Sequence, residues 1–155
     1  PVSDLQIILG KFFAGLALVL FSLLPTLIYY YTIYTLGSPE GNIDSGAMWG
    51  SYLGLFMLGA SFVSIGLFAS AVTDNQIVSF VASMFLCFFF YIAFDYLKSL
   101  DLLGNWDYIV EWLGIYFHYE SISRGVLDTR DVLYFISLIS LFLLLTKTVF
   151  GSRKW

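Results

Sequence analysis

Four long apolar stretches constrain this chain more than any other feature of its sequence. They run from about Phe12 to Tyr34, Trp49 to Val72, Ile77 to Leu97 and Val132 to Phe150. Each offers roughly the 20 residues that a helix needs to cross a hydrocarbon core about 30 Å thick. Hydrocarbon gives an exposed backbone no hydrogen bonds, so these stretches must be helices, and the alternation of a membrane β-strand is absent from them.

Composition supports the same class of protein. Of the 155 residues, 59% are hydrophobic and only 12% are charged, a balance that a soluble domain of this size cannot hide inside one core. We therefore predict an all-α fold, a polytopic transmembrane bundle of about four spans that forms a single domain over residues 1–155. Pro25 lies inside the first span and is expected to kink it, because proline removes a backbone hydrogen bond.

The distribution of cations predicts the orientation. Four spans place both ends of this segment on one side of the membrane, and no cation lies in the connection 36–48 between the first two spans. The cations near the two ends are Lys11, Lys147, Arg153 and Lys154. By the positive-inside rule both ends are cytoplasmic. The third connection carries three more cations among seven acids, and acids contribute little to the rule.

The second span carries a ridge of small residues. Gly46, Gly50 and Gly54 follow one another at four-residue spacing, which removes side chains along one face of the helix. Small residues let another backbone approach closely, and membrane helices associate in this way because lipid supplies no hydrophobic drive. We predict that this face packs against protein. The alternative is that glycine is merely tolerated there.

The segment 105–131 before the last span has a different character. Its stretch from Trp106 to Tyr119 is apolar and aromatic, but it is too short and too interrupted by acids to cross the bilayer. We expect an interfacial or re-entrant helical segment on the outer side, with Trp106 and Trp112 as interface anchors. Two interpretations stay open, a lateral lid over a substrate path and a structural collar around the bundle.

Charged residues cluster at the end of this segment. Asp128 and Asp131 precede an apolar run, as expected for a helix start with acids in its first turn. Arg124 and Arg130 are expected to pair with Glu120 and the aspartates. These residues and the single histidine are predicted to form a structural network without catalysis: His118, Glu120, Arg124, Asp128, Arg130 and Asp131.

No pattern in the sequence predicts catalysis, a metal or a cofactor. His118 and Glu120 are two residues apart, which matches no metalloprotease helix and places them on different helix faces. No glycine-rich loop of the kind that cradles phosphates is present, so ATP hydrolysis is not expected on this chain. A net charge of -4 and the lack of a basic patch argue against nucleic acid as a partner.

Several short motifs resemble one family of membrane proteins. They are His118-Tyr119-Glu120-Ser121, Ser123-Arg124-Gly125, Asp128-Thr129-Arg130-Asp131-Val132, Leu9-Gly10-Lys11-Phe12, the loop Gly37 to Asp44, and Asp74-Asn75-Gln76-Ile77. With them the chain resembles the permease subunit of type-2 ABC exporters, and most narrowly the gliding-motility-associated ABC transporter permease of Bacteroidetes. The resemblance covers essentially the whole chain. Permeases of this family have six spans, so the match implies that these are the C-terminal four.

The resemblance implies a transport subunit of the bacterial inner (plasma) membrane, linked to gliding motility or secretion. Its partners would be an ABC ATP-binding subunit, a second permease in a homodimer or heterodimer, and an auxiliary membrane protein. The ATPase would push on the inner side of the bundle. The residues implied in that coupling are Asp4, Lys11, Asp74, Asn75 and Gln76. Two other classes stay open: a membrane-embedded enzyme that uses the acids of 120–131 on a lipid-linked substrate, and a non-transporting scaffold.

Overall fold

The computed structural model describes residues 2–100 and 104–152, and helices make up 86% of these residues. No strand occurs in the described part of the chain. Four helical stretches are long and apolar enough to cross a membrane: Asp4–Leu36, Ser45–Val72, Gln76–Ser99 and Thr129–Ser152. Each contains one predicted span, so the predicted all-α fold with four spans is confirmed, and the chain is a multi-pass helical membrane protein. Arg153 and Lys154, used above to predict orientation, lie outside the described residues.

The first span is a rod of two helices, α1 (Asp4–Leu23) and α2 (Leu27–Leu36), joined by the 3-10 turn η1 (Leu24–Thr26). The turn contains Pro25, which has no N–H to continue the α-helical bonding pattern. The hydroxyl of Thr26 donates to the carbonyl oxygen of Leu23 at 2.6 Å, so the hydroxyl of Tyr52 on the next helix donates to Thr26 at 2.8 Å. A 3-10 turn therefore lies where a kink is predicted, and a polar contact to the second span lies beside it.

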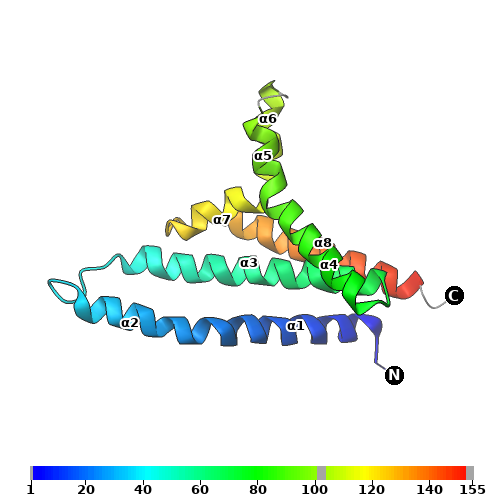
Figure 1. Cartoon of the computed structure of the whole chain (residues 1–155), viewed down its shortest axis with the longest axis horizontal. Helices are drawn as coiled ribbons and strands as arrows, with labels where there is room; N and C mark the ends of the chain where they lie inside the picture. The colour runs from blue at the N-terminus through cyan, green and yellow to red at the C-terminus, as the bar shows by residue number, and fades with distance from the viewer. Residues whose placement is uncertain (1, 101–103, 153–155) are drawn as a thin grey trace.

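The centre of the bundle is α3 (Ser45–Val72), which begins at the N-cap Asp44 and contacts α1, α4, α7 and α8. Figure 1 shows α3 lying beside the α1–α2 rod. The loop between α2 and α3 marks one end of the molecule, here the α2–α3 end. The start of α1, the turn between α3 and α4 and the last turn of α8 lie together at the other end, here the α3–α4 end.

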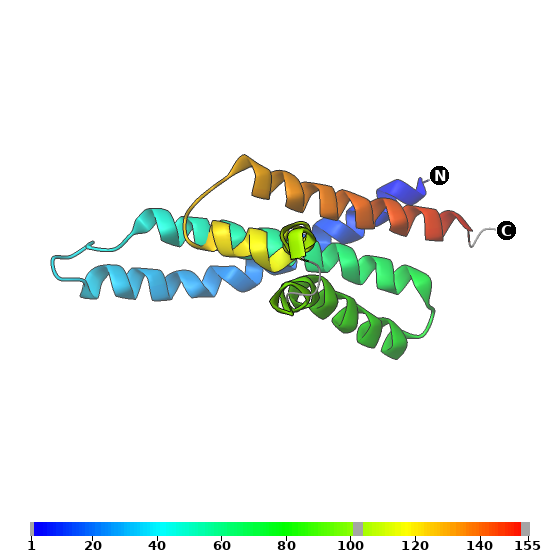
Figure 2. The same cartoon turned by 90° about the horizontal axis from the view of Figure 1, so that it is seen from above.

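The third span changes direction part-way along. It consists of α4 (Gln76–Phe88), the π-helical segment η2 (Phe89–Ala93) and α5 (Phe94–Ser99). Beyond η2, α5 leaves the bundle and pairs with α6 (Asp107–Leu113), which follows the 3-10 turn η3 (Gly104–Trp106). Figure 1 shows this α5–α6 hairpin standing away from the other helices, and Figure 2 views it end-on. π-Helical turns are a recognised cause of such bends.

Two helices complete the fold and enclose its core, α7 (Ile115–Ser123) and α8 (Thr129–Ser152). α7 packs on the half of α3 nearer the α2–α3 end, and α8 packs on the other half. Together with α3 they bury a cluster of apolar side chains: Ile65, Ile115, Ile122, Phe135, Leu138 and Phe142. The predicted segment 105–131 therefore contains two helices. The first, α6, packs against α5, and the second, α7, packs against α3 and α8.

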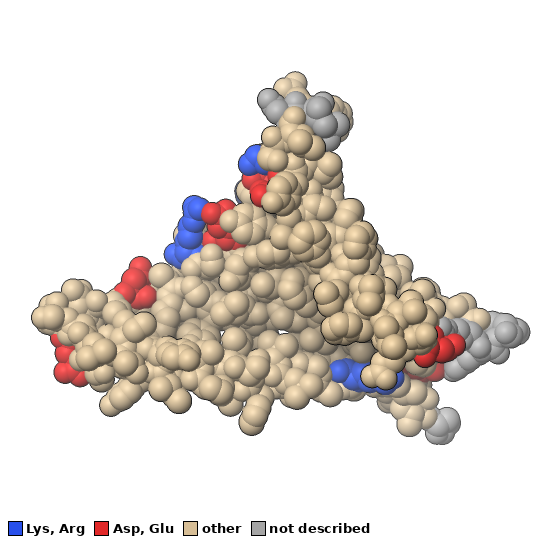
Figure 3. Space-filling model, in the orientation of Figure 1, with Lys and Arg blue, Asp and Glu red and all other residues tan. Residues whose placement is uncertain are grey.

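The surface separates by polarity in the way expected for a protein in lipid. Figure 3 shows charged groups along one edge, from the α5–α6 hairpin to the α2–α3 end, and again at the α3–α4 end, with a broad uncharged surface between them. On α4, large apolar side chains such as Phe80 and Phe85 are 65% and 67% exposed. Lipid covers such side chains at no cost, so this exposure agrees with a span that faces the bilayer.

Candidate functional site: a buried histidine–aspartate pair

The start of α8 is fixed by the capping that the sequence predicts. The Asp128 carboxylate accepts a hydrogen bond from the N–H of Arg130 at 2.9 Å, and the Asp128 carbonyl oxygen accepts from the N–H groups of Asp131 and Val132. Asp128 is therefore the N-cap, and its negative charge lies at the favourable end of the helix dipole. Asp131 is in the first turn as predicted, but its carboxylate does not serve the cap.

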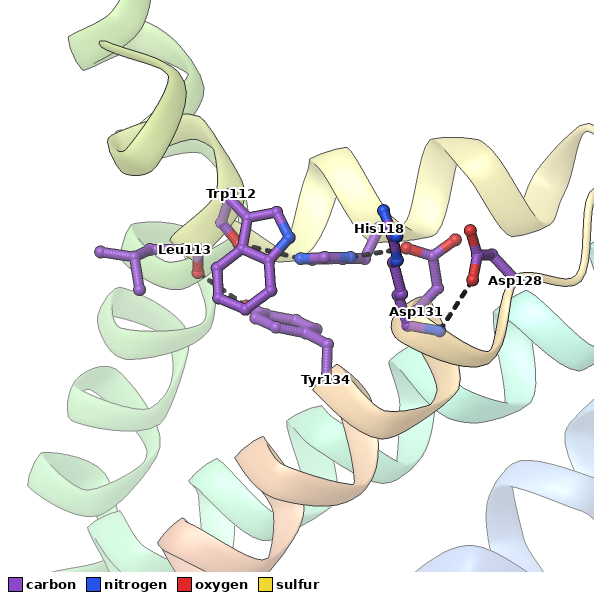
Figure 4. A network of polar contacts seen from close by, with 7 residues as sticks. Trp112, Leu113, His118, Asp128, Asp131 and Tyr134 are labelled. Atoms are coloured by element: carbon purple, nitrogen blue, oxygen red, sulfur yellow. Dashed lines mark hydrogen bonds and ion pairs between the residues drawn. The ribbon is translucent and has the colours of Figure 1, made fainter. Parts of the chain in front are cut away.

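The carboxylate of Asp131 instead contacts the single histidine of the chain. Nδ1 of His118 on α7 lies 2.6 Å from Oδ1 of Asp131 on α8, and Nε2 lies 2.8 Å from the carbonyl oxygen of Trp112 on α6. Only 1% of His118 and 5% of Asp131 is exposed. Figure 4 shows the imidazole held between the two oxygen partners. The pair thus ties the three helices together at one point.

Aromatic rings enclose this pair. The ring of Tyr134, one turn after Asp131, stacks on the imidazole with a centroid distance of 3.9 Å and an interplanar angle of 20°. The hydroxyl of Tyr134 donates to the carbonyl oxygen of Leu113 at 2.7 Å. The indole of Trp112 meets the imidazole edge-on, with centroids 5.5 Å apart. Tyr134 therefore joins α8 to the end of α6 by a second route (Figure 4).

The geometry determines how many protons the pair carries. A carbonyl oxygen only accepts, so the bond to Trp112 requires a hydrogen on Nε2 of His118. The 2.6 Å contact between Nδ1 and Asp131 then needs one more hydrogen, either on the imidazole or on the carboxyl group. Both arrangements have a net charge of zero. A neutral, hydrogen-bonded pair is what a buried site requires, because an unpaired buried charge is costly.

The six residues predicted as one network all line one polar pocket of about 350 Å³, but their side chains form separate contacts. Arg124 pairs with Glu120 one turn earlier on α7, so this predicted pair is confirmed. Glu120 and His118 line the same pocket but have different partners. The expectation that Arg130 pairs with the aspartates is wrong. Its guanidinium makes no ion pair among the described residues, and its only bond to Asp128 is through the backbone N–H. The carboxylate of Asp128 instead caps α8, and that of Asp131 contacts His118.

The small-residue ridge of α3 packs against α7 and the turn that follows it. A Cβ built on Gly50 would lie 2.6 Å from Cα of Gly125, and one built on Gly54 would lie 3.2 Å from Cγ2 of Ile122. The hydroxyl of Ser51 donates to the carbonyl oxygen of Ser123 at 2.7 Å. The predicted packing of the ridge is confirmed for Gly50 and Gly54. It is wrong for Gly46, whose only neighbour within 4 Å is its own N-cap Asp44, because α7 ends before that level of α3.

The residues implied in coupling lie at the α3–α4 end. Lys11 and Asp74 line the same small cavity, about 210 Å³, between α1, α3 and α8, and Nζ of Lys11 lies 5.8 Å from the ring centroid of Phe150. Asn75 is the N-cap of α4, where its carboxamide oxygen accepts from the N–H of Ile77 at 2.9 Å. Asp4 and Gln76 are the first residues of α1 and α4. The structure thus brings two of the five residues into one cavity.

Sequence reasoning missed two members of the pair's surroundings, Tyr134 and the carbonyl oxygen of Trp112. Tyr134 follows Asp131 by three residues on a predicted helix, so helical spacing alone places both side chains on one face. The Trp112 carbonyl leaves no trace in the sequence, because every residue has one.

Neither a metal-binding arrangement nor a similarity to a known protein assigns a function to this site. Within residues 2–100 and 104–152 no group of three or more His, Cys, Asp or Glu side chains is arranged to hold a metal ion. No protein family, curated protein or solved structure matches the chain.

Proposed function

We propose that this chain is the membrane-spanning permease subunit of an ATP-driven ABC transporter of the bacterial inner membrane, linked to gliding motility or secretion. The proposal rests on the resemblance of its motifs to type-2 ABC exporters. One observation carries it further. Lys11 of α1 and Asp74 of the turn between α3 and α4, which the resemblance implies in coupling, line one cavity at the α3–α4 end.

The partners follow from this role. ATP is hydrolysed by a separate ABC ATP-binding subunit, which contacts the α3–α4 end, where the short turn between α3 and α4 reaches out of the bundle. A second permease, identical or different, completes the path across the bilayer, and an auxiliary membrane protein accompanies the complex. In this arrangement the α3–α4 end and both ends of the segment are cytoplasmic. The α5–α6 hairpin and α7 then lie on the outer side.

A membrane-embedded enzyme acting through the acids of 120–131 is the rival proposal, and the geometry favours it less. Glu120 pairs with Arg124, Asp128 caps α8, and Asp131 contacts His118. Both ring nitrogens of His118 are also occupied. A general acid or base needs a position from which it reaches a substrate proton, and these groups are held by protein partners. The network acts as a structural joint between α6, α7 and α8.

Co-purification tests the transport proposal. We expect the full-length protein, purified from its native membranes, to bring down an ATPase subunit and to show ATP hydrolysis. Lys11→Ala removes the cation of the cavity and is expected to lower ATP turnover several-fold while the complex stays assembled. Lys147→Ala is the matched control, because Lys147 is exposed on α8 and does not line this cavity.

The outcomes separate the three classes. Partners without ATPase activity would favour the scaffold. Turnover of a lipid-linked substrate by the purified chain alone would favour the enzyme. An equal effect of the Lys11 and Lys147 substitutions would contradict a coupling role for this cavity, because the two positions then act only through net charge.

Orientation is tested by cysteine accessibility on a Cys87→Ser background. Single cysteines at Ser38 in the α2–α3 loop and at Asn105 before α6 are expected to react with a membrane-impermeant maleimide in intact cells. A cysteine at Ser152, at the end of α8, is expected to react only after the membrane is permeabilised. Labelling of the Ser152 position in intact cells would contradict cytoplasmic ends.

A further inference from the structure

Charged residues follow one edge of the molecule, from the loop between α2 and α3 to the α5–α6 hairpin (Figure 3). This charged edge consists of Glu40, Asp44, Lys98, Glu111, Glu120, Arg124, Asp128 and Arg130. It mixes acids with cations, and Lys98 and Arg124 pair with Glu111 and Glu120. The side chains of Lys98 and Arg124 are still 44% and 70% exposed. Exposed charges are costly in hydrocarbon, so the charged edge has to meet headgroups or water.

The charged edge extends over much of the length of α3. Asp44 caps the start of α3, and α7, with its exposed ion pair, packs at Gly50 and Gly54. The hairpin leaves the bundle at η2, where the ring centroids of Tyr91 and Phe62 are 6.2 Å apart. Between Asp44 and Phe62 the helix rises about 27 Å, which is nearly the thickness of a hydrocarbon core.

A bilayer surface perpendicular to α3 cannot satisfy the whole molecule. If it passes through the α2–α3 end, the ion pair of Lys98 and Glu111 lies deep in hydrocarbon, which is costly. If it passes through the hairpin, α2 stands in water, although α2 has no charged residue and its Ile28 and Leu36 are 66% and 78% exposed. A helix that is apolar on all sides is stable only where protein or lipid surrounds it. Each of these placements therefore leaves one part of the chain in unfavourable surroundings.

We propose that one surface of the bilayer lies along the charged edge, oblique to α3, so that lipid headgroups cover this edge from the α2–α3 loop to the hairpin. The exposed charges then contact headgroups and water, while α2 and the outward faces of α1 and α4 contact acyl chains. Trp49 of α3 and Trp112 of α6, which are 57% and 43% exposed, both lie at headgroup depth, where tryptophan is favoured. This placement does not depend on the proposed transport function.

Helix lengths agree with an oblique crossing. α3 has 28 residues, none of them charged, and a length of about 42 Å, so it fits a core of about 30 Å only when it is tilted by roughly 40°. The uncharged part of the third span, from Gln76 to Phe94, is about 28 Å long and crosses the core without such a tilt. Figure 1 shows α4 leaving the turn after α3 at an angle to α3, as this difference in tilt requires.

The depths of two native tryptophans, Trp49 and Trp112, distinguish the placements. Ile122 of α7 packs at Gly54 of α3, and His118, whose ring contacts that of Trp112, lies one turn of α7 further from the α2–α3 end. Trp112 is therefore about nine residues, or about 13 Å, beyond Trp49 along α3. A surface perpendicular to α3 at the α2–α3 end places Trp112 deeper than Trp49 by this distance. The oblique surface places both at the same depth.

Quenching by brominated lipids measures these depths. Each tryptophan is studied alone, with every other tryptophan of the full-length protein changed to phenylalanine, in nanodiscs of phosphatidylcholine that carries bromine at different positions along its acyl chains. We expect the same shallow bromine position to quench Trp49 and Trp112 most strongly. Phe85→Trp in a protein without other tryptophans is the control. Phe85 is 67% exposed in the middle of the third span, so a deeper bromine position is expected to quench this reporter best.

Three outcomes would overturn the proposal. Strongest quenching of Trp112 by a deeper bromine position than that for Trp49 would place the bilayer surface across the α2–α3 end. Quenching of Trp112 without quenching of Trp49 would place α2 and the start of α3 in water. Quenching of both native tryptophans at the depth of the Phe85→Trp reporter would place the charged edge inside the hydrocarbon.

Discussion

Replacing Gly50 with alanine is expected to destabilise the folded chain by about 2 kcal/mol or more, the range found for overpacking a tightly packed interior. The new Cβ would lie 2.6 Å from Cα of Gly125 and 3.0 Å from the carbonyl oxygen of Ile122. Both are backbone atoms, which cannot swing aside as a flexible side chain does. The turn after α7 would have to move away from α3.

The turn has little freedom to adapt. Gly125 has a φ of +83°, a conformation that glycine adopts without strain, and a Cβ at this position would itself lie 2.6 Å from Cα of Ala47 on α3. The two helices therefore meet through backbone on both sides. A larger residue at Gly50 also separates Ser51 from the carbonyl oxygen of Ser123, and this loses a bond of 2.7 Å between α3 and α7.

Gly66→Ala is the matched control on the same helix. Its Cβ would meet only the hydroxyl of Ser83, at 4.0 Å, so its effect is expected to stay within about 1 kcal/mol and to favour the helix through propensity. Reversible unfolding of the purified protein in mixed micelles measures both changes. If Gly50→Ala is as stable as Gly66→Ala, the close contact between α3 and the Gly125 turn does not exist in the folded protein.

Removing one partner of the buried pair is expected to have an effect of similar or larger size. Asp131→Leu leaves a ring nitrogen of the buried His118 without its partner, and His118→Phe leaves a buried carboxylate without its partner. Breaking a buried pair in this way costs about 3–5 kcal/mol in soluble proteins. The double substitution removes both polar groups, keeps a ring on Tyr134 and is expected to be more stable than the sum of the single effects predicts.

A double-mutant cycle measures this coupling. The four proteins are compared by unfolding in mixed micelles, and the coupling energy is expected to be about 2 kcal/mol, because contacting residues in one hydrogen-bonded network do not act independently. Arg124→Gln serves as the control, since Arg124 is 70% exposed in its pair with Glu120 and exposed pairs contribute little. Strict additivity of the His118 and Asp131 effects would mean that the two side chains do not interact.

Much of the fold could be predicted from local features of the sequence. The four spans follow from runs of apolar residues, because a backbone in lipid has to satisfy its own hydrogen bonds within each helix. The break at Pro25 and the cap at Asp128 follow from properties of single residues and their nearest neighbours. The pair of Glu120 and Arg124 follows from four-residue spacing on one helix. In each case the partner lies within one or two turns along the chain.

The tertiary structure decided which helix faces meet. The partner of Gly50 is Gly125 and the partner of His118 is Asp131, whereas Arg130 has no ion-pair partner within residues 2–100 and 104–152. None of these follows from the sequence, because lipid covers an apolar face as well as protein does and gives no hydrophobic preference between faces. The helices meet where small residues permit contact and where buried polar groups find each other. In this chain both conditions are satisfied around α7, whose position therefore fixes the site.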